Sequence, residues 1–170
     1  MSGGQTALVV LVPEADVAIG HHRLRHDANA ARGVPAHVTV LHPFRSPLDR
    51  ATAGQVAQLC RGFAPFEARF ASVGRFPGEV VWLTPEPTEV FAALLAAATE
   101  HFPDVPPYDG TIPDPIPHLT IAEGVSPEIA DELTTAVAPV LPLTTFVTEL
   151  ALLVQDGTGR WSVGRSWPLG

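Results

Sequence analysis

The stretch His37-Val38-Thr39-Val40 recurs 81 residues further along the chain as His118-Leu119-Thr120-Ile121, with histidine, an apolar residue, threonine and an apolar residue in the same order. Both copies lie in short apolar runs, 36–41 and 117–122, whose length and β-branched residues predict strands. Because side chains alternate between the two faces of a strand, each histidine shares a face with its threonine, and the apolar residues face a core. We therefore expect two imidazoles and two hydroxyls to converge on one small cleft, if the two strands lie near a pseudo-twofold axis.

The predicted elements around each motif follow one another in the same order in both halves of the chain. The Ser-Pro pairs at 46–47 and 126–127 predict helix starts, with serine as N-cap, proline at the first helical position and Asp49 near the free amides of the first turn. In the first half we expect a strand at 7–12, a helix at about 14–32, the motif strand, a helix from 46 to about 61 and a strand at 66–73; in the second half a strand at 79–84, a helix at about 87–101, the motif strand, a helix from 126 and a strand at about 146–154.

This duplicated order predicts the fold class. We expect an α+β protein that forms one bilobal domain over residues 1–170, with pseudo-repeats of about 1–75 and 76–170 related by a pseudo-twofold axis. Each half supplies antiparallel strands with helices on one face, which predicts two antiparallel sheets with helices on their outer faces and a central cleft.

Two segments break the predicted symmetry. Residues 102–116 form a proline-rich loop with three aspartates, longer than the matching connection in the first half. Such loops are either functional or variable insertions, and the sequence alone leaves both readings open. The turn signature at 155–159 predicts that the C-terminus adds a hairpin.

Composition limits the partners. Among 170 residues, 46% are hydrophobic and 16% charged, the net charge is −8, and all ten basic residues are arginine. Long duplex nucleic acid is excluded as a partner of the bulk surface because basic groups supply that affinity, whereas a small nucleotide or an RNA end is not excluded. No apolar run approaches the about 18 residues of a membrane span, and the single Cys60 is expected to be a buried thiol, so we expect a cytoplasmic monomer without membrane contact.

The paired motifs suit phosphoryl transfer through a strained cyclic phosphate. One neutral imidazole takes a proton from the attacking water or hydroxyl, while the other imidazole, protonated, gives one to the leaving oxygen. Threonine hydroxyls donate hydrogen bonds to the non-bridging oxygens, whose charge must be held during displacement. This chemistry needs no metal and no cofactor.

At these residues the chain resembles the two-histidine phosphoesterase superfamily, close to its 2′-5′ RNA ligase and cyclic phosphodiesterase branch. Residues 35–44 and 116–121 carry the resemblance, and residues 159–169 are similar to the last strand of some bacterial members. The resemblance implies His37 and His118 as the acid and the base, with His37 as the acid by analogy for hydrolysis, and Thr39 and Thr120 as phosphate binders.

Two positions differ from similar sequences and bear on the substrate. Glu123 stands where RNA-processing members often carry arginine, and His42 stands where an aromatic residue is common. Phe44, Trp82 and Tyr108 are, together with His42, the candidates for contact with a base or ribose, although core or loop packing is the ordinary role of such aromatic residues.

One further group of histidines has a weaker functional interpretation. His22 and His26 lie four residues apart on the helix predicted at 14–32, a spacing that would place two metal ligands on one helix face. A solvated helix face explains the pair adequately, and because the sequence has no His-Glu-x-x-His arrangement and no second ligand cluster, we expect no metal site.

The sequence thus favours a metal-independent phosphodiesterase that acts on 2′,3′-cyclic or related nucleotide or RNA-end phosphates, with reverse 2′-5′ RNA ligation as a further activity of the same site. Two alternatives stay open. One is a nucleotide or RNA-end binding protein without catalysis, and the other is a phosphodiesterase for a small cyclic phosphate outside RNA metabolism.

Overall fold

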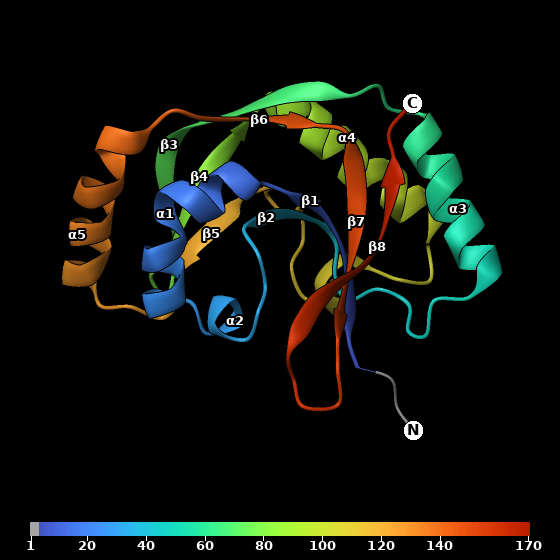
Figure 1. Cartoon of the computed structure of the whole chain (residues 1–170), viewed down its shortest axis with the longest axis horizontal. Coiled ribbons are helices and arrows are strands. Elements are labelled where there is room, and N and C mark those ends of the chain that lie inside the picture. Colours follow the sequence, from blue (N-terminus) through green and yellow to red (C-terminus); the bar gives the residue numbers. More distant parts are fainter. Residues whose placement is uncertain (1–3) are drawn as a thin grey trace.

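The computed structural model describes residues 4–170 and contains two four-stranded antiparallel sheets (Figure 1). The terminal sheet, with strand order β2-β1-β7-β8, takes its strands from both ends of the chain: β1 (Thr6–Leu11), β2 (His37–Leu41), β7 (Glu149–Gln155) and β8 (Trp161–Pro168). The central sheet, with strand order β5-β4-β3-β6, contains β3 (Phe66–Phe76), β4 (Val80–Glu86), β5 (Leu119–Ala122) and β6 (Leu143–Val147). Neighbouring strands pair antiparallel in both sheets, as predicted.

The helices divide between the two sheets. Helices α1 (Pro13–His26) and α5 (Pro127–Val137) pack on the central sheet, and α3 (Arg50–Arg61) and α4 (Thr88–His101) pack on the terminal sheet, with α4 also contacting β4. Figure 1 shows α5 and α3 at opposite ends of the long axis of the molecule. The short helix α2 (Ala28–Ala31) follows α1, η1 (Pro107–Gly110) lies in the loop after α4, and η2 (Ala138–Val140) follows α5. The α+β, two-lobed architecture predicted from the repeat is confirmed.

One hydrophobic core joins the two lobes, and the motif strands contribute to it. Val38 and Val40 of β2 and Leu119 and Ile121 of β5 are all buried in this core. Burying such a side chain contributes about 1.5–3 kcal/mol, and a slip of one residue would turn every one of them toward the solvent face. The core therefore fixes which face of each motif strand is left for the histidine and the threonine.

A second, smaller cluster lies on the other face of the terminal sheet. It consists of Ala7, Val9, Val34, Ala151 and Leu153. Strands β1 and β7 are buried on both faces as a result, which explains why residues 7–12 form an uninterrupted apolar run rather than an alternating one.

Two predicted helices begin or end elsewhere, and aspartate caps explain both differences. The helix predicted at 14–32 is divided into α1 and α2 at Asp27, which has extended backbone angles and accepts a hydrogen bond from the Asn29 amide at 2.9 Å. The helix predicted from Ser46 begins at Arg50, because Asp49 is its N-cap and accepts from the Thr52 amide at 2.7 Å. Ser126 does cap α5, as predicted, and accepts from the amide of Ile129.

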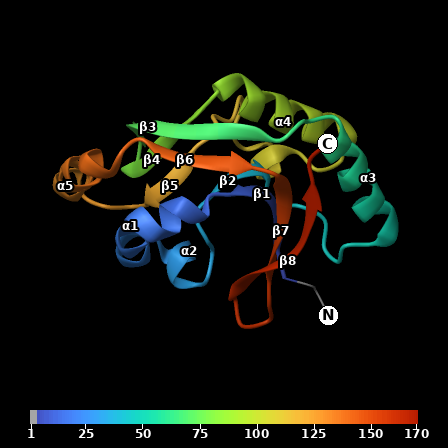
Figure 2. The same ribbon diagram turned by 45° about the horizontal axis from the view of Figure 1, so that its top comes forward.

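The closing strand predicted at 146–154 is two strands in different sheets. Strand β6 ends at Val147 in the central sheet, and β7 begins at Glu149 in the terminal sheet, so the chain crosses between the lobes at Thr148 (Figure 2). Burial alternates along β6 and becomes continuous from Leu150 to Leu153. The change in burial marks the crossing, but the sequence does not show it, because Thr145 is buried and Phe146 is exposed.

No helix within the described part of the chain, residues 4–170, has the length and apolar character that crossing a bilayer requires.

Candidate active site

The site lies where the two sheets meet edge to edge. Strand β2 is the edge of the terminal sheet, β5 is the edge of the central sheet, and the two strands pack against each other. A cavity of about 560 Å³ opens at this junction, and His37, Thr39, His118 and Thr120 all line it. The four residues of the two motifs thus share one cavity, although they come from distant parts of the chain.

The two histidines are held by the same backbone contact. The Nδ1 atom of His37 lies 2.7 Å from the carbonyl oxygen of Pro35, and Nδ1 of His118 lies 2.7 Å from the carbonyl oxygen of Ile116. A carbonyl oxygen can only accept, so Nδ1 carries a proton in both rings and Nε2 is the unprotonated nitrogen of the neutral form. Both rings therefore have the same tautomer and keep Nε2 free for proton transfer.

The threonines occupy matching places in their ladders. The register shifts after Leu8, which faces Leu41, so that Val9 faces Thr39; it shifts again after Val81, which faces Ala122, so that Trp82 faces Thr120. Such irregularities twist a strand locally and change the direction of a side chain. The same irregularity follows the threonine in both motif strands, and both threonines line the cavity.

Burial makes both imidazoles weak bases in the free protein. Burial lowers the pKa of His37 from 6.5 to about 4, and the hydrogen bond with Pro35 opposes this change. The positive charge of Arg23 lowers the pKa further, as His118 and His42 do when they are protonated. Burial also lowers the pKa of His118, against the opposing hydrogen bond with Ile116. Both rings are therefore mainly neutral at pH 7 in the free protein.

The loop 102–116 reaches the cavity through Tyr108. The Tyr108 amide donates to the His42 carbonyl oxygen at 2.7 Å, and Tyr108 and Asp109 have left-handed backbone angles, with φ of 52° and 55°. Residues other than glycine pay on the order of 1 kcal/mol or more for that conformation, so the surrounding contacts hold Tyr108 in place. Burial raises the pKa of the Tyr108 phenol, and a hydrogen bond with the Thr39 side chain partly opposes that rise.

The four candidates for substrate contact fall into two pairs. His42 and Tyr108 line the cavity, whereas Phe44 and Trp82 do not. Phe44 is buried and packs edge to face on Phe102 at 5.0 Å, which is a core contact. Trp82 stacks on Phe76 at 4.8 Å, and both rings lie edge-on to His118, so Trp82 supports the histidine and does not border the cavity.

Several cavity residues carry no motif. They lie in loops, at strand ends or in the short helix α2 and its caps, where the sequence gives no periodic signal, and they are Gln5, Asp27, Asn29, Arg32, Glu123, Gln155 and Trp161. Burial, together with the charge of Asp27, raises the pKa of the Glu123 carboxyl. The cavity wall that faces the motif residues is apolar in part, with Ala7, Val34 and Leu153 beside Trp161.

His22 and His26 do not line the cavity. Among residues 4–170, no group of three or more histidine, cysteine, aspartate and glutamate side chains is placed to hold a metal ion.

The sequence model of the 2′-5′ RNA ligase superfamily matches residues 11–159. Among solved structures, E. coli LigT complexed with 3′-AMP is 19% identical, with a TM-score of 0.63 and 99% of each chain covered. TT0787 of Thermus thermophilus is 21% identical, with a TM-score of 0.64 and 97% of each chain covered. E. coli LigT complexed with NADP+ is 18% identical, with a TM-score of 0.62 and 99% of each chain covered. A search of curated proteins finds no match to the chain.

Two facing edge strands with paired histidines and threonines define a phosphoesterase of the two-histidine class, and the solved structures share its fold over nearly the whole chain. The family model covers most of the chain, and the chain therefore belongs to the 2′-5′ RNA ligase superfamily.

Proposed function

We propose that this protein is a metal-independent phosphodiesterase that opens 2′,3′-cyclic or related nucleotide and RNA-end phosphates by two-histidine acid–base catalysis. One observation carries the proposal. His37 and His118 line the same cavity with the same Nδ1 contact, each accompanied by a threonine two residues further along its strand. A site that only bound an anion would need hydrogen-bond donors but not two matched titratable groups.

In the proposed reaction, a water molecule attacks the phosphorus of the cyclic phosphate. One neutral imidazole accepts a proton from the water as the new oxygen–phosphorus bond forms, and the other imidazole, protonated, donates its proton to the ribose oxygen as its bond to phosphorus breaks. The product is a phosphomonoester with one free ribose hydroxyl. The hydroxyls of Thr39 and Thr120 donate hydrogen bonds to the two non-bridging oxygens throughout.

The negative charge of the substrate favours the protonated imidazole that the reaction needs. Both histidines are neutral in the free protein, and a phosphodiester anion placed between them raises the pKa of each ring by favouring its charged form. The Arg23 charge lowers the pKa of His37 and is not among the causes that lower the pKa of His118, which supports His118 as the proton donor and His37 as the acceptor. This assignment is the reverse of the one implied by family analogy.

The shape and charge of the molecule support a small nucleotide as the ligand. E. coli LigT has been crystallised with 3′-AMP and with NADP+, both small nucleotides. A cavity of about 560 Å³ is of the size that small-molecule sites have, and Trp161, Tyr108 and His42 offer ring faces for a base. The net charge of −8 opposes long duplex nucleic acid. We propose a cytoplasmic monomer, in keeping with the free, buried thiol of Cys60.

A second substrate class has one specific observation in its favour. Glu123 and Asp27 place two carboxyl groups on the cavity wall, which disfavours further phosphates near the reacting one. A small cyclic phosphate outside RNA metabolism would meet no such repulsion. In 2′-5′ ligation the same groups would keep these roles, with the 5′-hydroxyl of a second RNA end in place of the attacking water, and cleavage of a 2′,5′ linkage would reverse both proton transfers.

The purified chain is to be incubated with 2′,3′-cyclic mononucleotides in excess chelator, and the products separated by chromatography. We expect hydrolysis to a single monophosphate isomer at an undiminished rate. The same assay with glycerol 1,2-cyclic phosphate separates the two substrate classes, and 2′,5′-linked dinucleotides test ligation. Activity that is lost with chelator and restored by a divalent cation would contradict the proposed mechanism.

A further inference from the structure

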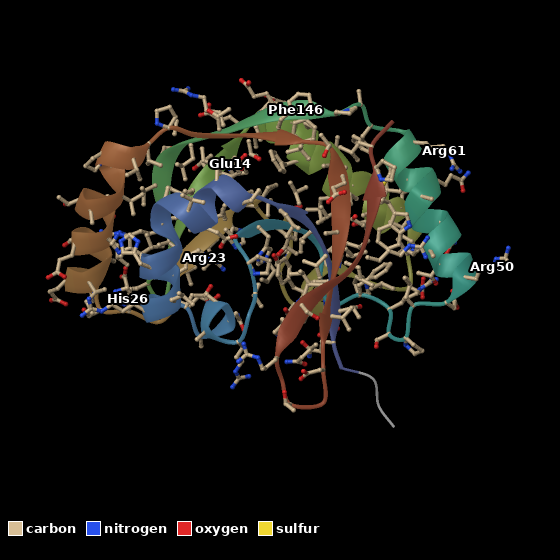
Figure 3. All side chains as sticks on the ribbon, viewed as in Figure 1. Glu14, Arg23, His26, Arg50, Arg61 and Phe146 are labelled. Atoms are coloured by element: carbon tan, nitrogen blue, oxygen red, sulfur yellow. The ribbon has the colours of Figure 1, made fainter. Side chains whose placement is uncertain are left out.

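Arg23 is a buried cation on α1 that contacts the backbone of both motif segments. Its side chain donates from Nε to the Thr120 carbonyl oxygen at 3.1 Å and from Nη1 to the Val34 carbonyl oxygen at 3.2 Å. Only 2% of the residue is exposed. A single guanidinium thus bridges β5 of the central sheet and the segment that leads into β2 of the terminal sheet; Figure 3 labels Arg23 on α1, the helix that covers β5.

Two carboxylates hold the guanidinium in this place. Asp16 Oδ1 lies 3.3 Å from Nη1, and Asp27 Oδ2 lies 3.4 Å from Nη2. Asp16 Oδ1 also accepts a hydrogen bond from the Ala36 amide at 3.0 Å, one residue before His37. Helix α1 therefore holds the segment 34–36 through two side chains, and one of these side chains also reaches β5.

The end of α1 adds a third link to the second motif. The Glu123 amide, which follows β5, donates to the His26 carbonyl oxygen at 3.0 Å. Both motif segments are thus fixed to the same helix, and among the side-chain hydrogen bonds of residues 4–170 only those of Arg23 join the two.

We propose that Arg23 is a positioning residue that sets the separation and orientation of His37 relative to His118 by tying their two strands to one rigid, planar group. The proposal rests on the proposed function, because it concerns the pair of groups that would share one phosphate. Two proton-transfer groups must flank a single phosphate closely, and a misplacement of about 1 Å costs on the order of 10²-fold in rate.

The chemistry of arginine explains why this residue type is needed. A guanidinium has five donors in a fixed fork and can serve two carbonyls and two carboxylates at once, whereas an ammonium is a compact charge with three donors. The positive charge of Arg23 also disfavours the protonated form of His37.

Two substitutions separate geometry from charge. Arg23→Lys keeps the charge and the ion pairs but loses the fork, and Arg23→Gln keeps an amide donor but loses the charge. Arg25→Gln is the matched control, because Arg25 lies two residues further along α1 with an exposed side chain. Thermal melting checks that each variant is folded.

With a 2′,3′-cyclic mononucleotide as substrate, we expect Arg23→Lys to lower kcat by about 10- to 100-fold with a smaller change in KM. In NMR titrations without substrate, we expect Arg23→Gln to raise the pKa of His37, Arg23→Lys to leave it unchanged, and both to shift the ring signals of His37 and His118 together. Arg25→Gln should change none of these quantities.

A folded Arg23→Lys protein with wild-type kcat, or a folded Arg23→Gln protein with an unchanged His37 titration, would overturn the proposal. If Arg23→Gln does not fold, Arg23→Lys alone decides. A wild-type protein without phosphodiesterase activity would instead overturn the proposed function, and Arg23 would then be judged by the histidine signals, which need no turnover.

Discussion

The two motif segments share their backbone but not their surroundings. Nδ1 of each histidine donates a hydrogen bond to the carbonyl oxygen two residues earlier, at the same 2.7 Å, and each threonine comes directly before a register shift in its strand. Around the rings the symmetry ends, because His37 has Arg23 as a charged neighbour while His118 lies against Phe76 and Trp82. The repeated backbone fixes where two equivalent groups lie, and the neighbours that are not repeated make their proton affinities different.

The largest effect is expected from removal of either imidazole. His37→Ala and His118→Ala should each lower kcat on cyclic nucleotides by roughly 10² to 10⁴, because general acid–base catalysis contributes that much. His21→Ala, an exposed histidine on α1, is the control and should leave kcat unchanged. Steady-state kinetics of the folded variants checks this. A wild-type kcat in either variant would show that the two histidines, although equivalent in backbone position, do not both take part in catalysis.

Removal of a threonine hydroxyl should have the next largest effect. Thr39→Val and Thr120→Val keep the shape and the β-branched backbone preference but lose a donor to a charged oxygen, and we expect kcat to fall on the order of 10²-fold in each. Serine at either position should restore most of the rate, and Thr135→Val, on an exposed face of α5, should have no effect. A wild-type rate in both valine variants would remove the threonines from the proposed phosphate site.

These expectations draw on residues whose placement the sequence predicted to different degrees. The alternation of apolar and polar residues predicted that Val38 and Leu119 enter the core and that the motif histidines stay on the opposite face, because a strand has only two faces. Helix starts were harder, since Ser46 and Asp49 both suit an N-cap and only the three-dimensional contacts select Asp49.

The sequence could not predict the remaining site residues, for a physical reason. Gln5 and Trp161 line the cavity from a strand end and a hairpin, and Arg23 bonds to both motif segments from a helix. No short-range pattern records which segments a fold brings together. Tyr108 was a candidate, but its position depends on a left-handed backbone in the loop 102–116 that no periodicity marks. The division of the chain into repeats at about residue 75 stays a prediction.

The pH dependence separates the two histidines. The unperturbed pKa of histidine predicts an optimum of kcat/KM near neutrality. Burial lowers the pKa of His37 to about 4 and the pKa of His118 below its ordinary value of 6.5. We therefore expect the optimum of kcat/KM to lie between these two values. Above the optimum the required imidazolium is lost, so the rate should fall roughly tenfold per pH unit. The limbs belong to the coupled pair and do not by themselves name the acid.

The check is a profile of kcat/KM from pH 3 to pH 10 in buffers of about constant ionic strength. A rate that rises steadily toward pH 10 would exclude an imidazolium donor and so contradict the paired mechanism.

The smallest effect is expected from removal of the Tyr108 phenol, which lies beside Thr39 of the first motif. Tyr108→Phe removes the phenol beside Thr39 but keeps the ring, and the loss of one net hydrogen bond of about 0.5–1.5 kcal/mol predicts a fall of only a few-fold in kcat/KM. Tyr108→Ala, which also removes the ring, should raise KM further. A loss beyond 100-fold in Tyr108→Phe would make the phenol part of the chemistry and the two motifs unequal in function.

The central claim is that both motifs act on one phosphate, and a crystal structure of the protein with inorganic phosphate or a nucleotide 3′-monophosphate tests it most directly. We predict one phosphate group within hydrogen-bond distance of Nε2 of both His37 and His118, with the hydroxyls of Thr39 and Thr120 on two of its oxygens. A phosphate bound by a single motif, or elsewhere in the molecule while the cavity stays empty, would contradict the account.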